Sequence, residues 1–239
     1  MEKGIGPVSQ MEYPGRIIIL GTSPAGDDVI MYAVTGRSPS SQARRLVKEK
    51  RTVYVKPTDE SALQSGNPDL LIYPAIIVGK WKWIAVSNGK QTDDIPLHFK
   101  KGASPVAVLG NALGKWDFEP DAPNYTPRIS GCVCDGAALS IIRRAPDGGV
   151  SRSYFEVPKA PGRGRLIATY AGLNADPLPS FNGEPVEIDI DFATPRESAA
   201  ALYKALTPAK GGDDFRVAVV ALYRDSSGRL KFALKNRHK

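Results

Sequence analysis

The chain has 239 residues, of which 42% are hydrophobic, a formal net charge of +7 and a pI near 9.4. This length suffices for one buried core, whereas no stretch reaches the roughly 18 uninterrupted apolar residues of a membrane helix, and residues 1–16 lack the apolar centre of a secretory signal. We therefore expect a cytoplasmic globular protein, whose excess of basic residues favours an anionic partner, either nucleic acid or a phosphorylated small molecule.

Short runs rich in Ile, Val and Tyr, separated by Gly, Pro, Asp and Ser, predict a protein dominated by strands. In chain order the predicted strands are residues 16–21, 29–35, 71–78, 81–86, 128–134, 139–143, 153–157, 166–170, 186–192, 215–223 and 230–234. The first two strands and the next two are each expected to form a hairpin. Strict alternation over residues 186–192 predicts that one face of that strand is buried.

Helices are fewer. Residues 194–206 combine a capping Thr194, Pro195 in the first turn and Glu197 three residues after the cap, a pattern typical of a helix start. Residues 104–116 are a second helix candidate and residues 41–48 a third. Many hairpins with a few intervening helices favour an α+β fold of antiparallel sheets covered by helices over a parallel sheet.

Common catalytic signatures are missing from the sequence. There is no nucleophile elbow, phosphate-binding loop, HExxH zinc motif or dinucleotide fingerprint. Two cysteines, Cys132 and Cys134, and two histidines, His98 and His238, offer too few ligands for a zinc site, so we expect no metal and two small buried cysteines. Catalysis would then depend on Arg, Tyr, Glu, Asp, Asn or backbone groups, which act by positioning and electrostatic stabilisation.

Polar residues gather where predicted strands end. After the second strand come Arg37 and Ser38, and then Arg44 or Arg45, which the sequence does not distinguish. Guanidinium groups with hydroxyl donors suit a phosphate, and each charge-assisted hydrogen bond contributes roughly 1.5–3 kcal/mol. A proline after Tyr73 favours an extended backbone there.

Two further polar segments follow. The bend after the fourth predicted strand gathers Ser87, Asn88, Gln91, Thr92 and Asp93. The loop before the fifth predicted strand carries Glu119, and that strand begins at Arg128. Taken one at a time, the residues of these polar segments fit ordinary roles: Arg37 as a surface charge, Tyr73 as a core aromatic and Asn88 as part of a turn.

In this order, the segments YAVTGRS (32–38), NPDLLIYP (67–74), VSNGKQTDDI (86–95) and NYTPRI (124–129) resemble the archaeal-type inosine monophosphate (IMP) cyclohydrolases, and MEYPGR (11–16) is similar to the start of that family. The resemblance covers about residues 11–129, and later residues match loosely. It implies an N-terminal extension, 1–10, before a single domain, 11–239. It also implies a four-layer αββα sandwich of antiparallel sheets, similar to N-terminal-nucleophile hydrolases but without the N-terminal nucleophile, so self-cleavage is not expected.

The same resemblance implies the dehydrative ring closure of 5-formamidoimidazole-4-carboxamide ribonucleotide to IMP, a step of purine biosynthesis that requires no cofactor. The partner would be this purine nucleotide, without nucleic acid or membrane, and relatives imply a homo-oligomer such as a tetramer. Two alternatives stay open. One is an amide-hydrolysing enzyme acting on another heterocycle, and the other is a non-catalytic protein that binds nucleotides or nucleic acid, with basic residues and exposed aromatics along one face.

Site roles follow from matching the motifs residue by residue. The implied catalytic residues are Arg44 near the base, Tyr73 as proton donor to the departing oxygen, and Glu119, which orients the carboxamide or receives its proton. The implied substrate-binding residues are Arg37 and Ser38 at the phosphate or ribose, Asn88 and Thr92 at the base, Asp93 as a brace of the bend, and Arg128, which binds phosphate or anchors Asp117.

Overall fold

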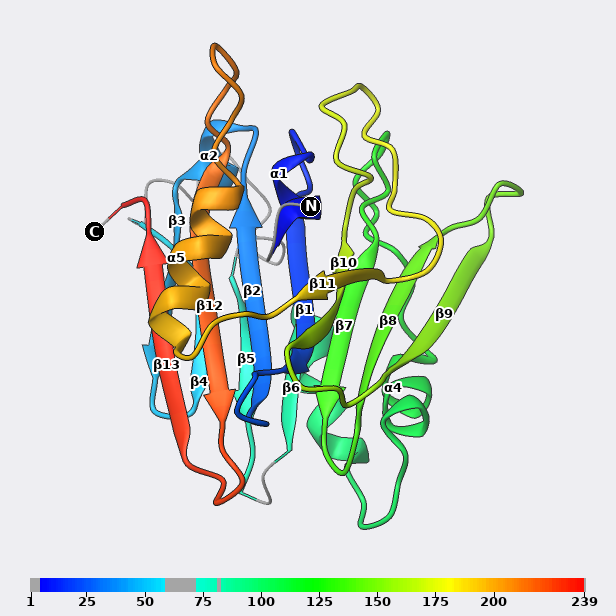
Figure 1. Ribbon diagram of the computed structural model, residues 1–239. Coiled ribbons are helices and arrows are strands. Elements are labelled where there is room, and N and C mark those ends of the chain that lie inside the picture. Colours follow the sequence, from blue (N-terminus) through cyan, green and yellow to red (C-terminus); the bar gives the residue numbers. More distant parts are fainter. Residues whose placement is uncertain (1–4, 59–71, 81–82, 239) are drawn as a thin grey trace.

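Two antiparallel sheets form the molecule in the computed structural model, which describes residues 5–58, 72–80 and 83–238 (Figure 1). The six-stranded sheet has the order β11 (Val186–Asp189), β10 (Arg163–Ala168), β1 (Arg16–Thr22), β2 (Asp28–Thr35), β12 (Arg216–Arg224) and β13 (Leu230–Asn236). The seven-stranded sheet has the order β3 (Arg44–Glu49), β4 (Thr52–Pro57), β5 (Tyr73–Val78), β6 (Ile84–Ser87), β7 (Arg128–Val133), β8 (Ala137–Arg144) and β9 (Val150–Val157).

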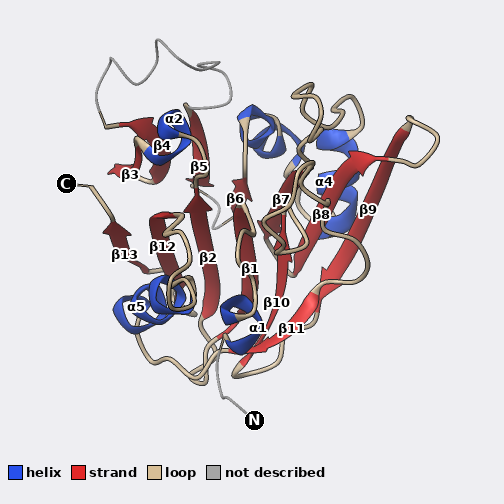
Figure 2. Ribbon diagram, turned by 90° about the horizontal axis from the view of Figure 1, so that it is seen from above, coloured by secondary structure: helices blue, strands red, loops and turns tan. Residues whose placement is uncertain are grey.

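The helices are short and lie outside the sheets or in loops. They are α1 (Gly6–Ser9), α2 (Pro39–Gln42), α4 (Pro105–Leu113), α5 (Pro195–Ala205) and the 3₁₀ turns η2 (Lys90–Asp93) and η3 (Ile95–His98). Helix α5 packs on β12 and β13, and α4 packs on β7, β8 and β9, so each covers the outer face of one sheet (Figure 2). None of the described helices is long and apolar enough to span a membrane.

The main core lies between the sheets. All four residues from Ile17 to Leu20 are fully buried, because β1 is central in its sheet and also contacts β7 and β8 of the other. At Gly131 in β7, an added Cβ would lie only 3.0 Å from the side chain of Leu20. The sheets therefore approach closely around β1, and side chains at its first residue reach the space between them.

Most predicted elements are confirmed. The α+β fold with antiparallel sheets is observed, as are both expected hairpins, β1–β2 and β5–β6. The helix predicted over 194–206 is α5, with the expected capping box between Thr194 and Glu197, and the second candidate is α4. Residues 71 and 81, at the starts of two predicted strands, lie outside the described residues. The resemblance to N-terminal-nucleophile hydrolases stays a prediction.

The helix predicted over residues 41–48 is wrong. Only the single turn α2 is helical, with Ser38 as its cap, and β3 begins at Arg44 and pairs with β4, a strand that the sequence analysis missed. Arg44 and Leu46 are buried while Arg45 and Val47 are partly exposed, a period of two that belongs to a strand. The prediction of two buried cysteines is confirmed for Cys132 only, because Cys134 lies past the end of β7 and is half-buried.

Candidate functional site

Polar side chains from both sheets meet at one end of the sandwich. The six-stranded sheet contributes Arg16 and Tyr32, and the seven-stranded sheet contributes Arg44 and Tyr73, while Glu119 comes from the loop between α4 and β7. We call these five residues the interlayer cluster. Their exposed fractions range from 0% to 9%, although all five carry a charge or a hydroxyl at the end of the side chain. Buried polar groups of this kind need partners, so their contacts decide what the cluster can do.

The two tyrosines form a pair across the sheets. Their hydroxyl oxygens lie 2.8 Å apart, within hydrogen-bond distance. Burial raises the pKa of Tyr32 well above its ordinary value, and the neighbouring Tyr73 raises it further, against the opposing effect of Arg16. Tyr32 therefore keeps its proton at neutral pH and can donate it or a hydrogen bond to Tyr73.

Neighbouring backbone groups hold the side chain of Arg44, but not all of its hydrogen-bond donors have a partner. Its Nε donates to the carbonyl of Ser41 at 2.7 Å, and its Nη2 donates to the carbonyl of Thr35 at 3.3 Å. Its Nη1 has no hydrogen-bond partner among the described residues. Burial lowers the pKa of Arg44, and the charge of Arg16 lowers it further. Since Arg45 points to the other face of β3, the structure places Arg44 rather than Arg45 in the cluster.

Arg16 is a cluster residue to which the sequence analysis gave no role. Burial acts to lower its pKa, but Tyr73, Glu119 and two further tyrosines together outweigh burial and raise the pKa well above the ordinary value, so the guanidinium stays charged. Its Nε lacks a hydrogen-bond partner within the described part of the chain. The only signal for Arg16 in the sequence was its place at the end of the segment MEYPGR.

Glu119 is the acid of the cluster. Its carboxylate lies 3.5 Å from Nη1 of Arg128 and is 2% exposed. Burial raises its pKa, and the charges of Arg16 and Arg128 oppose that rise. Its backbone N–H donates to Thr126, whose hydroxyl lies 2.6 Å from that of Tyr170. The loop that carries Glu119 is thereby fixed to the six-stranded side.

The bend after β6 uses its polar side chains internally. The Oδ1 of Asn88 accepts from the side chain of Gln91 and from the backbone N–H of Ile129, both at 2.9 Å, and its Nδ2 donates to the carbonyl of Pro127. Thr92 donates to the carbonyl of Gly89 at 2.7 Å. These bonds join the bend to the start of β7, next to Arg128.

Arg128 links this bend to the cluster. Its Nη1 donates to Gln91 at 3.1 Å and faces Glu119, and its Nε donates to the carbonyl of Asp117 at 2.8 Å, so the expected anchoring of Asp117 is observed at the backbone. Asp93 is exposed, and the brace expected of it falls to Asp94, which accepts from the indole of Trp116 at 2.6 Å. The physical reason is that η2 turns the earlier acid outward.

Replacing Asn88 by alanine is expected to lower the free energy of unfolding by about 1–3 kcal/mol, because the buried N–H of Ile129 and the amide of Gln91 lose their acceptor. Urea unfolding followed by circular dichroism measures this. Asn182→Ala, at an exposed loop residue, is the matched control and should change stability by less than about 0.5 kcal/mol. Equal effects of the two substitutions would contradict a bracing role for Asn88.

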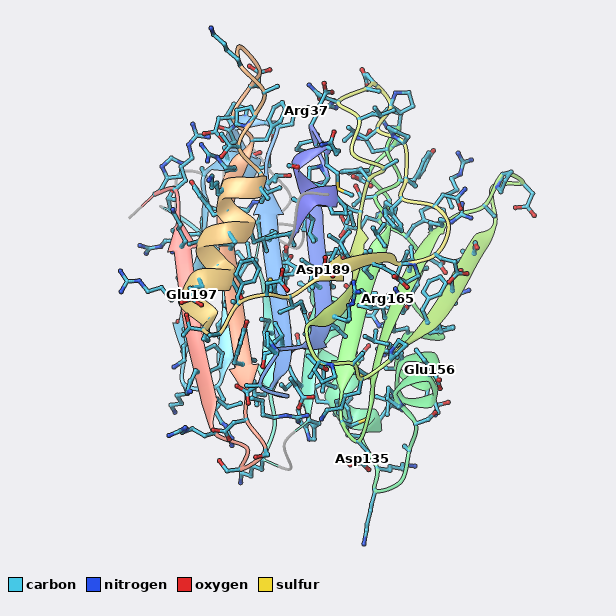
Figure 3. The ribbon with its side chains drawn as sticks, viewed as in Figure 1. Arg37, Asp135, Glu156, Arg165, Asp189 and Glu197 are labelled. Atoms are coloured by element: carbon cyan, nitrogen blue, oxygen red, sulfur yellow. The ribbon has the colours of Figure 1, made fainter. Side chains whose placement is uncertain are left out.

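The predicted phosphate residues Arg37 and Ser38 lie outside the interlayer cluster. Arg37 is exposed at the same end of the molecule (Figure 3), where it donates to the carbonyl of Ala175 at 2.8 Å and lies 5.9 Å from the ring centre of Tyr13. Ser38 caps α2. Arg37 lines a cavity of about 620 Å³ together with Gln42, Asn174, Ala175, Asp176, Asp213, Asp214, Phe215 and Arg237.

Tyr13 lies between this cavity and the cluster. Its ring stacks on that of Tyr170, with centroids 5.7 Å apart, and contacts Phe215, which lines the cavity. Of the predicted residues, the structure thus brings Arg44, Tyr73, Glu119 and Arg128 together. Asn88 and Thr92 support them from behind, whereas Arg37, Ser38 and Asp93 are at the surface.

A solved structure, Anbu from Hyphomicrobium sp. strain MC1, covers 93% of this chain and 88% of its own at 11% identity, but its TM-score of 0.34 carries no argument about the fold. Sequence relatives are more informative. An IMP cyclohydrolase of Methanopyrus kandleri is 31% identical over 187 residues, 71% of this chain and 89% of that protein.

Two further relatives and a family model agree. An IMP cyclohydrolase of Methanothrix thermoacetophila is 29% identical over 87% of this chain and 98% of its own, and one of Methanococcus maripaludis is 28% identical over 62% of this chain and 71% of its own. The model of the family described as IMP cyclohydrolase-like protein matches residues 13–227, a range that contains all five residues of the interlayer cluster. On these matches, the chain belongs to the IMP cyclohydrolase-like family.

Proposed function

We propose that this protein is an IMP cyclohydrolase, which closes 5-formamidoimidazole-4-carboxamide ribonucleotide to inosine monophosphate with loss of water. The family membership supports the reaction class. The observation that carries the proposal is the interlayer cluster, which combines a hydroxyl pair, a carboxylate with a raised pKa and guanidinium groups with free N–H donors. A dehydrative closure needs a proton donor, a proton acceptor and a group that stabilises negative charge on oxygen.

The closure forms one bond and breaks one. The carboxamide nitrogen attacks the formyl carbon, gives up a proton to Glu119 and leaves the formyl oxygen negatively charged. Tyr73 then protonates that oxygen, the formamido N–H supplies the second proton as the ring double bond forms, and the carbon–oxygen bond breaks with loss of water. The proton that Glu119 accepted then returns to Tyr73, which restores both residues. Both reacting groups are on one imidazole ring, so the enzyme contributes orientation and charge stabilisation and no covalent intermediate.

The remaining residues divide between support and binding. Arg128 holds Glu119 in place, Asn88 fixes the segment that carries Arg128, and Thr92 stabilises the bend itself. We assign the ribose phosphate to the cavity beside Arg37, because it is open at the same end of the molecule and carries a second arginine, Arg237. Since Arg44, Tyr73 and Glu119 expose at most 2% of their surface, the base reaches them only after a local movement of the side chains that cover them.

The decisive experiment mixes the purified protein with the formylated ribonucleotide and follows IMP by ultraviolet absorbance, with product identity checked by chromatography. Turnover well above the uncatalysed rate is expected. Release of formate with the deformylated aminoimidazole ribonucleotide would instead show an amide hydrolase. Absence of turnover, combined with nucleic-acid binding that weakens steeply with salt, would favour the hypothesis of a non-catalytic nucleic-acid-binding protein and reject the cyclohydrolase proposal.

A further inference from the structure

Two guanidinium groups in the interlayer cluster have N–H donors that no protein acceptor uses. These donors are Nε of Arg16 and Nη1 of Arg44, and neither has a hydrogen-bond partner among the described residues. The exposed fraction is 9% for Arg16 and 1% for Arg44. A buried donor without an acceptor costs free energy, more so on a charged group, so a fold selected for stability alone would pair it.

The neighbours of these two arginines are the groups that the proposed reaction uses. The electrostatic influence of Arg16 extends to Tyr73, Glu119, Tyr32 and Arg44. Among the described residues, Arg16, Arg44 and Arg128 act on the buried carboxylate of Glu119, whose anionic neighbour is the partly exposed Asp121, so cations still outnumber anions there. Such an excess of positive charge, held away from water, favours an oxygen that becomes negative during a reaction.

Arg16 reaches this position from the sheet opposite to Arg44. It is the first residue of β1, pairs with Val34 on β2, and its backbone N–H donates to Thr169 at 3.1 Å. Tyr32 is two residues before Val34 on the same strand. The side chains of Arg16 and Tyr32 are therefore on the same face of the sheet, the one that faces the seven-stranded sheet. The two arginines therefore approach the tyrosine pair from opposite layers.

We propose that Arg16 is a substrate-contacting residue, and that its free Nε–H acts with the free Nη1–H of Arg44 as the donor pair for the oxygen that the ring closure expels. This inference rests on the proposed function and adds Arg16 to the residues implied by the family motifs. The formyl oxygen gains negative charge when the carbon–nitrogen bond forms and loses it when Tyr73 delivers its proton. The two donors stabilise that charge in the interval between the two events.

The test is Arg16→Gln, with Arg16→Lys beside it. Loss of a donor to a developing oxyanion is expected to lower kcat about 10²- to 10³-fold. The affinity for IMP, measured by calorimetry, should change by less than about threefold, because IMP lacks the expelled oxygen and therefore shows ground-state binding alone. Arg16→Lys keeps the charge but loses the geometry of the fork and should recover part of the activity.

Arg224→Gln is the matched control. Arg224 is a similarly buried arginine, but its Nε and Nη2 donate to Asp28 at 2.9 and 2.6 Å, and it lies near Asp135, at the end of the molecule opposite to Arg37 (Figure 3). Its loss should lower the melting temperature and leave kcat unchanged, because a buried partner is removed far from the cluster.

Two results would overturn the role of Arg16. One is a kcat of Arg16→Gln within about threefold of the wild-type value. The other is a parallel loss of IMP affinity and melting temperature, which would show a merely structural residue. An absence of cyclohydrolase turnover in the wild-type protein would reject the proposed function itself. The assay distinguishes that result from the two results that concern Arg16 alone.

Discussion

Tyr73→Phe is expected to lower kcat about 10²- to 10⁴-fold with little change in the melting temperature. The substitution removes the hydroxyl that we assign as proton donor but keeps the ring, which is fully packed between the sheets. The hydroxyl of Tyr32 loses its partner 2.8 Å away, which should cost about 1 kcal/mol of stability. Steady-state kinetics of IMP formation and thermal unfolding measure the two effects.

The control for this substitution is Tyr223→Phe. Tyr223 is equally buried, and its hydroxyl lies 2.7 Å from that of Ser198 and donates to the carbonyl of Phe192, beneath α5 and away from the cluster. It should show a similar loss of stability and an unchanged kcat. An undiminished kcat in Tyr73→Phe would remove Tyr73 from the chemistry and leave Tyr32 as the candidate donor.

Glu119→Gln is the substitution with the second large expected effect. Its kcat should fall about 10²- to 10⁴-fold, because the amide cannot accept a proton. KM should change less than kcat, since glutamine keeps the size and hydrogen-bonding reach of the side chain. Measurement of both parameters across pH is the appropriate assay. A variant whose kcat stays within about threefold of the wild-type value would show that Glu119 only orients the carboxamide or plays no part in turnover.

The same variant makes a prediction for stability with a definite sign. Burial raises the pKa of Glu119 in the folded protein, against the opposing charges of Arg16 and Arg128. The folded state therefore holds the proton to a higher pH than the unfolded chain, and the wild type loses stability as pH rises from the ordinary glutamate pKa through the raised one. Glutamine has no such loss, so the variant should be more stable at neutral pH, and the difference should close below the ordinary pKa.

Pattern and composition were sufficient for much of the fold. Hydrophobic runs with turn residues located the central strands, and the Thr194 capping box located α5, because these signals act within a few residues. The strand β3 was missed because Arg44 is an inward-facing charge, which hides the alternation that normally marks a strand. Burial of that charge depends on the opposite sheet, and no local pattern reports it.

The sequence also predicted part of the candidate site. Motif resemblance identified Arg44, Tyr73, Glu119 and Arg128, which the structure brings to one place. It did not reveal that the amide of Asn88 is bound to the backbone of Pro127 and Ile129 at the start of β7, since a buried amide and a ligand-binding amide look alike in sequence.

The sequence did not predict Arg16 and Tyr32 as part of the candidate site, for a different reason. They lie on the strands of the opposite sheet, and their relation to Tyr73 exists only in the packed sandwich.

The division of the interlayer cluster between two sheets has a consequence for how such a protein can diversify. Under the proposed function, neither sheet alone carries all the groups that the reaction uses, so a fragment with one sheet would lack the activity. New specificity must then arise in the connecting loops that surround the cluster, whereas the spacing fixed by Leu20 against Gly131 has to be passed on intact.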